Sequence, residues 1–244
     1  MSRNCLTALL VLVSIAAVTM PVAKAMADAG GIVRADRIAS SVLGRSIAYT
    51  IYLPPQRIAA RQAHHRVLYL LHGHGDDQHA WLRHGRIKRT LDSLIAARRL
   101  PPIVVVMPMA GNSWYVDDAR GARGFGAMAR ALTGDFIPGV EARHGIAPCR
   151  EGRAIGGLSM GGFGAVLYAF DNPHRFSAAI SLSGSLFAAN LADDPGRRRR
   201  LAQIFGGVYG TPFEPEKFRA WNVFSRLDRL ARSAEAVPAV WLAA

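Results

Sequence analysis

Residues 154–162 constrain this chain most, because they join an apolar run to a Gly-x-Ser-x-Gly motif. The motif spans Gly157 to Gly161 with Ser159 at its centre, and a helix-forming stretch, 163–170, follows it. Strand, sharp turn and helix in that order predict an elbow that lifts a serine hydroxyl above the end of a sheet. Glycine is expected at both flanking positions, because a side chain there would collide with neighbouring backbone.

The rest of the chain predicts the sheet that such an elbow needs. From about residue 30 the pattern is strand, turn, strand, followed by alternating strand and helix, with no internal repeat and no dividing linker. This alternation predicts one α/β domain, with a mostly parallel central sheet and helices on both faces. Strands are expected at 45–52, 67–71, 103–107, 154–158, 178–182 and 239–242, helices at 87–98 and 126–140, and a long irregular insert with some helix at 184–236.

The N-terminus is typical of an export signal. Arg3 precedes an apolar run, 6–20, and small residues end at Ala25, where a signal peptidase would cut, with a second choice at Ala27. The run is short for a membrane span, which needs about 20 residues. We therefore expect a signal peptide at 1–25, a folded domain at 28–244, and a secreted or periplasmic protein without a stable membrane span.

Charge and cysteine content narrow the possible partners. The net charge is +13, but the arginines are scattered among alanines without interleaved aromatic residues, so nucleic acid is not an expected partner. The one tight basic run, 197–200, is expected to lie in a solvated loop, with docking to an anionic surface as the alternative. Cys5 leaves with the signal peptide, and Cys149 alone cannot form an internal disulfide.

Ser159 is the candidate nucleophile, and its backbone surroundings supply the candidate oxyanion donors. A serine hydroxyl reacts weakly until it is activated. The N–H of Met160 begins the following helix and is the first expected donor. A glycine-rich loop follows the strand at 67–71, and the N–H of His74 in that loop is the second expected donor.

The same loop has an alternative interpretation as a zinc site. His72, His74 and Asp76 stand at alternate positions, as in the metal-binding run of metallo-β-lactamase-type hydrolases, and histidine and carboxylate can ligate zinc. That run requires histidine directly after the aspartate, where this chain has Asp77. We therefore expect neither a metal nor another cofactor.

Several segments accompany the serine motif: LLHGHGD at 70–76 with Trp81, VMP at 106–108 with SWY at 113–115, GLSMGGFGA at 157–165, PHRF at 173–176 and SLSG at 181–184. Together they resemble the esterase D or putative esterase family of α/β-hydrolases from about residue 45 onward. By this resemblance Ser159 is the nucleophile, Met160 and His74 give the backbone oxyanion donors, and the substrate is a small-molecule ester. Trp114 and Tyr115 either line the substrate pocket or pack beneath the glycine-rich loop. Two further segments, FG at 205–206 and WN at 221–222, resemble the tributyrin-esterase branch of the family.

The triad acid and histidine of such enzymes are expected to be absent from this chain. In α/β-hydrolases they follow the serine in the order acid, then histidine. Family members place the acid after the strand that 240–244 resembles, so the domain is expected to be C-terminally incomplete and to lack its last strand and helix. His174 is the only histidine after Ser159, and the intervening helix, about 18 Å long, would hold it too far away.

Three functions remain open from the sequence. The first is an exported carboxylesterase of short-chain or aryl esters that works through an acyl-enzyme on Ser159, impaired by the missing groups. The second is an acyltransferase of the mycolyltransferase type, in which an alcohol replaces water. The third is a non-catalytic remnant on the hydrolase fold. The acyl chain, the alcohol and the oligomeric state are not specified by the sequence.

Overall fold

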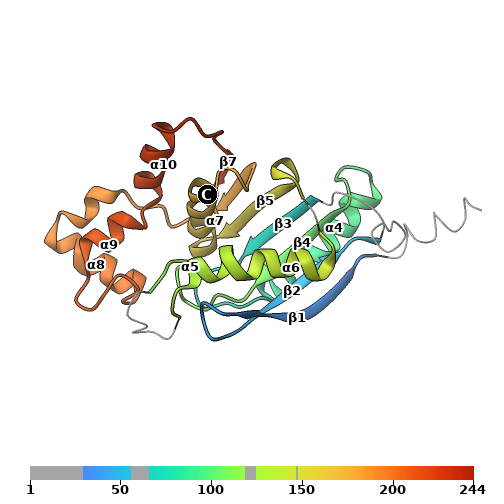
Figure 1. Ribbon diagram of the computed structural model, residues 1–244, viewed down its shortest axis with the longest axis horizontal. Helices are drawn as coiled ribbons and strands as arrows, with labels where there is room; N and C mark the ends of the chain where they lie inside the picture. Colours follow the sequence, from blue (N-terminus) through green and yellow to red (C-terminus); the bar gives the residue numbers. More distant parts are fainter. Residues whose placement is uncertain (1–29, 56–65, 119–124, 147) are drawn as a thin grey trace, which may run out of the picture.

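A seven-stranded sheet forms the centre of the computed structural model, which describes residues 30–55, 66–118, 125–146 and 148–244. The first two strands are antiparallel to their neighbours and the other neighbours are parallel, which confirms the predicted mostly parallel sheet. The strands are β1 (Ile32–Ser40), β2 (Arg45–Leu53), β3 (Arg66–Leu71), β4 (Ile103–Pro108), β5 (Arg153–Leu158), β6 (Ala178–Leu182) and β7 (Ala239–Ala243), in the spatial order β1-β2-β4-β3-β5-β6-β7 (Figure 1).

Helices pack on both faces of this sheet, as the sequence predicts (Figure 1). On one face, α4 (Ile87–Ala96) buries Leu91 and Ile95 against Leu70 and Val105. The larger core lies on the other face, beneath α6 (Ile137–His144) and α7 (Met160–Asp171). Every residue of α7 except its last is buried, so this helix is the central element of that layer.

The helix expected at 126–140 forms differently from the prediction. A short turn, α5 (Met128–Arg130), leads into a π-helical stretch (Ala131–Phe136) and then into α6, which continues to His144. Pro138 lies inside this run, where its missing N–H and its ring disfavour regular α-helix. The wider π turn before the proline accommodates it without breaking the helix.

The insert after β6 is more helical than expected. It contains a 3₁₀ turn (Ala189–Ala192), α8 (Pro195–Phe205), α9 (Pro215–Ala220) and α10 (Val223–Ala231), which gather at one end of the molecule (Figure 1). Asp194 and Asn222 cap the starts of α8 and α10 by accepting hydrogen bonds from backbone N–H groups. The arginine run at 197–200 therefore lies on a helix and not in the expected loop.

One part of the sheet surface is exposed. Leu158, Ile180 and Trp241 share the face that α4 covers at the opposite end of the sheet. The exposed fraction is 43% for Leu158 and 59% for Trp241, and β7 pairs only with β6 among the described residues. An uncovered apolar face is thus present in the part of the chain that the structure describes.

The expected signal peptide lies outside the described residues. Within the described ranges, no helix combines the length and apolar character that crossing a membrane requires.

Candidate active site

Ser159 occupies a sharp turn between β5 and α7. Its backbone angles are φ 55° and ψ −114°, a region that residues other than glycine rarely adopt. The turn is fixed by the Ser159 N–H, which donates to Leu182 O at 2.9 Å, and by the Phe163 N–H, which donates to Ser159 O at 3.0 Å. Such strain persists only where the surrounding structure imposes it, and it clusters at functional sites.

Two glycines make this turn possible. A Cβ atom at Gly157 would lie 2.3 Å from the carbonyl carbon of Gly161, and one at Gly161 would lie 2.4 Å from Leu71 O. Both contacts are with backbone, which cannot rotate away as a side chain could. The start of α7 therefore lies directly against the ends of β5 and β3.

Two backbone N–H groups close to Ser159 have no hydrogen-bond acceptor among the described residues. Met160 is the first residue of α7, so its N–H has no acceptor within the helix, and the helix dipole places partial positive charge there. Across the turn, the position of a Cβ at Gly73 is 3.9 Å from Ser159 Cβ. The next residue, His74, has an N–H without an acceptor among the described residues, and its exposed ring lies against Trp114.

His72 holds the same loop in place through both ring nitrogens. Nε2 accepts a hydrogen bond from the Ala110 N–H at 3.1 Å, so Nδ1 carries the proton and donates to Gly73 O at 2.8 Å. Burial lowers the pKa of His72, which keeps the ring neutral. This histidine ties the β3 and β4 loops together and has no lone pair left for zinc or for a serine proton.

Trp114 and Tyr115 lie beneath the loop. Tyr115 is fully buried, its hydroxyl donates to His72 O at 3.0 Å, and its ring packs against Gly164. Trp114 is 4% exposed and packs edge-on against Phe205, with ring centroids 4.3 Å apart. Of the two roles left open by the sequence, this geometry favours packing, because a fully buried ring has no surface for a substrate.

A hollow of about 170 Å³ lies near Ser159, which is not itself part of the lining, and the sequence did not single out Ala80, His84 and Gly85 in its wall. Gly73 and Leu158, which flank the serine, form one part of the wall, and Trp81 forms another. His84 and Asp76 also line it, with His84 Nε2 3.8 Å from Asp76 Oδ1. No sequence motif identifies His84 as a lining residue, because its position at the hollow depends on the turn that follows the helix at Ala80–Arg83.

Within the described ranges, no hydrogen bond reaches Ser159 Oγ from a histidine or a carboxylate. His174 is exposed beyond the far end of α7. No cluster of three or more histidine, cysteine, aspartate or glutamate side chains that could hold a metal occurs among the described residues.

Known proteins share both the sequence pattern and the fold. The sequence profile of the family described as putative esterase matches residues 40–243. An esterase of Mycobacterium tuberculosis is 32% identical over 206 residues, which cover 79% of this chain and 42% of that protein. An endo-1,4-β-xylanase/feruloyl esterase of Xylanibacter ruminicola is 27% identical over 180 residues, covering 72% of this chain and 24% of that protein. This chain therefore spans less than half the length of these two relatives.

Solved structures show the same fold. A ferulic acid esterase superposes with a TM-score of 0.62 at 22% identity, over 87% of this chain and 90% of that one. MPT51 of Mycobacterium tuberculosis superposes with a TM-score of 0.60 at 21% identity, over 86% of this chain and 73% of that one. The family profile covers most of the chain, including the strained serine turn and the sheet around it. The chain belongs to the putative esterase family, whose fold is that of the α/β-hydrolases.

Proposed function

We propose that this protein is a serine carboxylesterase in which Ser159 Oγ attacks the carbonyl carbon of a small-molecule ester. The alcohol leaves as an acyl-enzyme forms, and water then releases the carboxylic acid. The observation that carries the proposal is the strained Ser159 turn at the start of α7. This turn would present the half-buried Ser159 hydroxyl to an ester beside backbone N–H groups, as nucleophilic acyl transfer requires.

Met160 and His74 are the proposed oxyanion donors. The Met160 N–H belongs to the first turn of α7, and the His74 N–H lies on the loop that faces Ser159 through Gly73. Two N–H groups on opposite sides of the serine would stabilise the charge that develops on the carbonyl oxygen in the transition state. Because both are backbone groups, the loop positions determine the site more than side-chain identity does.

Short acyl groups are the proposed substrates. The hollow beside Ser159 holds about 170 Å³ and is mainly apolar, with Trp81 and Leu158 in its wall. A space of this size suits an acetyl or propionyl group better than a long acyl chain. We also propose that the protein is exported, which rests on the signal-like sequence at 1–25.

Hydrolysis of p-nitrophenyl acetate, butyrate and octanoate tests this function. We expect the rate to fall from acetate to octanoate. In Ser159→Ala we expect no rate above background. Ser185→Ala is the matched control, because among the described residues Ser185 hydrogen-bonds to the same turn through its backbone N–H and not through its side chain. Equal rates in Ser159→Ala and the unaltered chain would contradict the proposal, and added glycerol separates hydrolysis from acyl transfer by its glyceryl ester product.

A non-catalytic role on this fold is the second candidate. It is favoured by the Ser159 hydroxyl, which no histidine of the described residues activates. Oxyanion donors and binding alone retain roughly 10³-fold acceleration over water when triad members are removed. A measurable, Ser159-dependent rate therefore supports the impaired esterase, whereas no rate above that of Ser159→Ala supports the non-catalytic role.

A further inference from the structure

The arginine run on α8 separates into groups with different surroundings. Arg198 turns back and donates to Ala192 O and Asp193 O at 2.5 and 3.0 Å. Arg199 is exposed to solvent. Arg197 and Arg200 are three positions apart, so they lie on one side of the helix, and both line a hollow of about 320 Å³.

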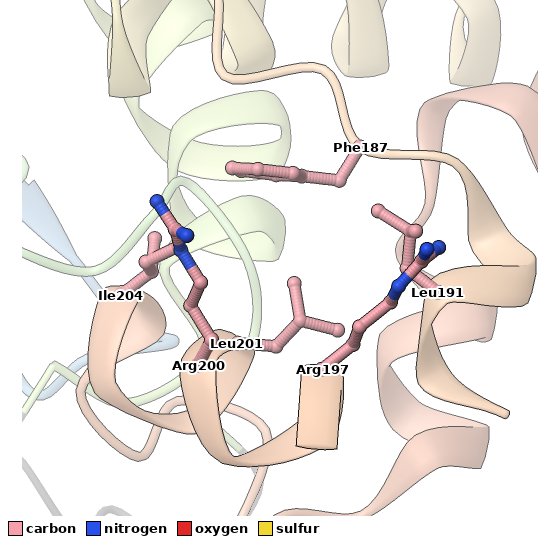
Figure 2. Close-up of a pocket in the computed structure, with 6 residues that line it drawn as sticks. All are labelled: Phe187, Leu191, Arg197, Arg200, Leu201 and Ile204. Atoms are coloured by element: carbon pink, nitrogen blue, oxygen red, sulfur yellow. The ribbon is translucent and has the colours of Figure 1, made fainter. Parts of the chain in front are cut away.

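The hollow has an apolar interior between these two arginines. Phe187 lies across from Leu201, and the guanidinium groups of Arg197 and Arg200 extend from α8 on either side of Leu201 (Figure 2). Leu191 and Ile204 complete the lining. The Phe187 ring also packs against Phe205, with centroids 5.7 Å apart, which fixes one wall of the hollow against the core.

Neither guanidinium has an acidic partner among the described residues. The nearby acids are engaged elsewhere: Asp193 pairs with Arg219, and Asp194 accepts the Arg197 backbone N–H as the helix cap. Two unpaired cations at the edge of an apolar hollow leave a positive charge that an anionic ligand would neutralise. The hollow is at the small end of the range for ligand sites, about 300–1,000 Å³.

We propose that this hollow binds a monocarboxylic acid with an unbranched alkyl body. The alkyl chain would lie on Phe187, Leu191 and Leu201, where removing each CH₂ from water favours binding. The carboxylate would accept hydrogen bonds from Arg197 and Arg200 once these exposed side chains turn toward it from either side of Leu201. Their planar guanidinium groups match carboxylate geometry. The binding site does not depend on the proposed esterase activity, although an acid of this class is what an esterase releases.

The shape of the site favours a single amphiphile over a membrane surface. The apolar residues line a concavity, and the cations stand beside it, so one chain can be enclosed with its charged end at the edge. Arg199 belongs to the same basic run but lies outside the hollow. A membrane surface would contact the exposed Arg199 as much as Arg197 and Arg200. Substitution of Arg199 should therefore weaken membrane binding but not binding of a single amphiphile.

Calorimetric titration of the chain with decanoate, below its micelle concentration, tests the proposal. We expect saturable binding that is about tenfold or more tighter than binding of decanol, because decanol lacks the charge. Arg197→Gln and Arg200→Gln should each weaken decanoate binding about tenfold, and Arg199→Gln, the matched control, by less than twofold. Ile204→Asn should weaken decanoate and decanol alike.

The same titration in Ser159→Ala separates this site from the proposed esterase site. Unchanged decanoate affinity in that variant supports a separate site, and it does so whether or not the chain hydrolyses esters. Equal affinities for decanol and decanoate would overturn the proposal, as would an Arg199→Gln loss equal to that of Arg197→Gln. Absence of saturation, or binding only to anionic phospholipid vesicles, would also overturn it.

Discussion

At the scale of single residues, the backbone contact of Gly161 tightly constrains the serine turn. A Cβ there would lie 2.4 Å from Leu71 O, so Gly161→Ala must shift α7 away from β3. We expect the free energy of unfolding to fall by about 1–3 kcal/mol, the usual cost of overpacking. Urea denaturation measures this change.

Gly134→Ala is the matched control for that substitution. Gly134 lies in the π-helical stretch, and an added Cβ would meet nothing within 4 Å. Alanine there should leave stability unchanged or raise it by up to about 1 kcal/mol. Equal unfolding free energies of the two variants would show that the backbone around Gly161 can shift to accept a Cβ without loss of stability.

His72 gives a residue-scale prediction on pH. Its folded pKa is lowered by burial, so between that pKa and about 6.5 the unfolded chain binds more protons than the folded one. Stability should therefore decrease as the pH falls from 7 toward 5. In His72→Gln this contribution disappears, and denaturation at several pH values should show a flatter profile; an unchanged slope would contradict the neutral, buried ring.

The sequence predicts the role of a single residue well where residues adjacent in the chain determine its local structure. Ser159 and its glycines form a local motif, so strand, turn and helix could be inferred together. The hollow near Ser159 could not be inferred from the sequence, because His84 and Leu158 meet there only after the sheet and the loops are assembled. For Trp114, the sequence left pocket and packing equally open, since burial by Phe205 comes from a segment 91 positions later.

At the scale of elements, a partly buried ion pair joins α6 to β5. Glu141 accepts hydrogen bonds from Arg153 at 2.8 Å and from the Tyr69 hydroxyl at 2.9 Å. The side chains of Glu141 and Arg153 are 15% and 12% exposed. Glu141→Gln leaves Arg153 without a charge partner, and we expect a loss of about 2–3 kcal/mol in unfolding free energy, slightly below the cost for fully buried pairs.

An equivalent arrangement at the surface provides the control. Asp36 also accepts hydrogen bonds from an arginine, Arg143, and from a tyrosine, Tyr49, but the Arg143–Asp36 side chains are 46% and 41% exposed. Exposed pairs contribute about 0–1 kcal/mol, so Asp36→Asn should cost less than Glu141→Gln. Similar losses in both variants would show that burial does not set the strength of the inner pair.

Elements with a strong period were predictable, and those set by tertiary contacts were not. The parallel strands read as continuous apolar runs, and their positions were predicted closely. The insert carries caps at Asp194 and Asn222, but its helices are short, with ends fixed by contacts to α7 and to the aromatic cluster around Phe205. Pro138 favoured a helix end, whereas the π turn carries the helix past it.

At the scale of the whole molecule, the sheet leaves an apolar face exposed toward its β7 edge. On β7, Trp241 is 59% exposed on this face and Leu242 is 60% exposed on the opposite face. The outer edge of β7 is unpaired within the described ranges. Such an edge favours pairing with another chain. We expect the apparent mass in sedimentation velocity to rise with protein concentration.

Leu242→Lys should reduce this association, because a charge on the edge strand opposes strand pairing. Val42→Lys is the control, since Val42 is exposed on a turn between β1 and β2 and away from β7. If both substitutions reduced the association equally, the cause would be the change in net charge and not the β7 edge.

Reaction with a fluorophosphonate, followed by intact-mass analysis and peptide mapping, tests the central claim most directly. The claim is that the strained turn at the start of α7 makes Ser159 the nucleophile of an esterase. We predict one adduct per chain, located on Ser159 and absent from Ser159→Ala, that forms slowly because no histidine among the described residues activates the hydroxyl. No adduct on Ser159 after prolonged reaction, or an adduct on another residue, would contradict the claim.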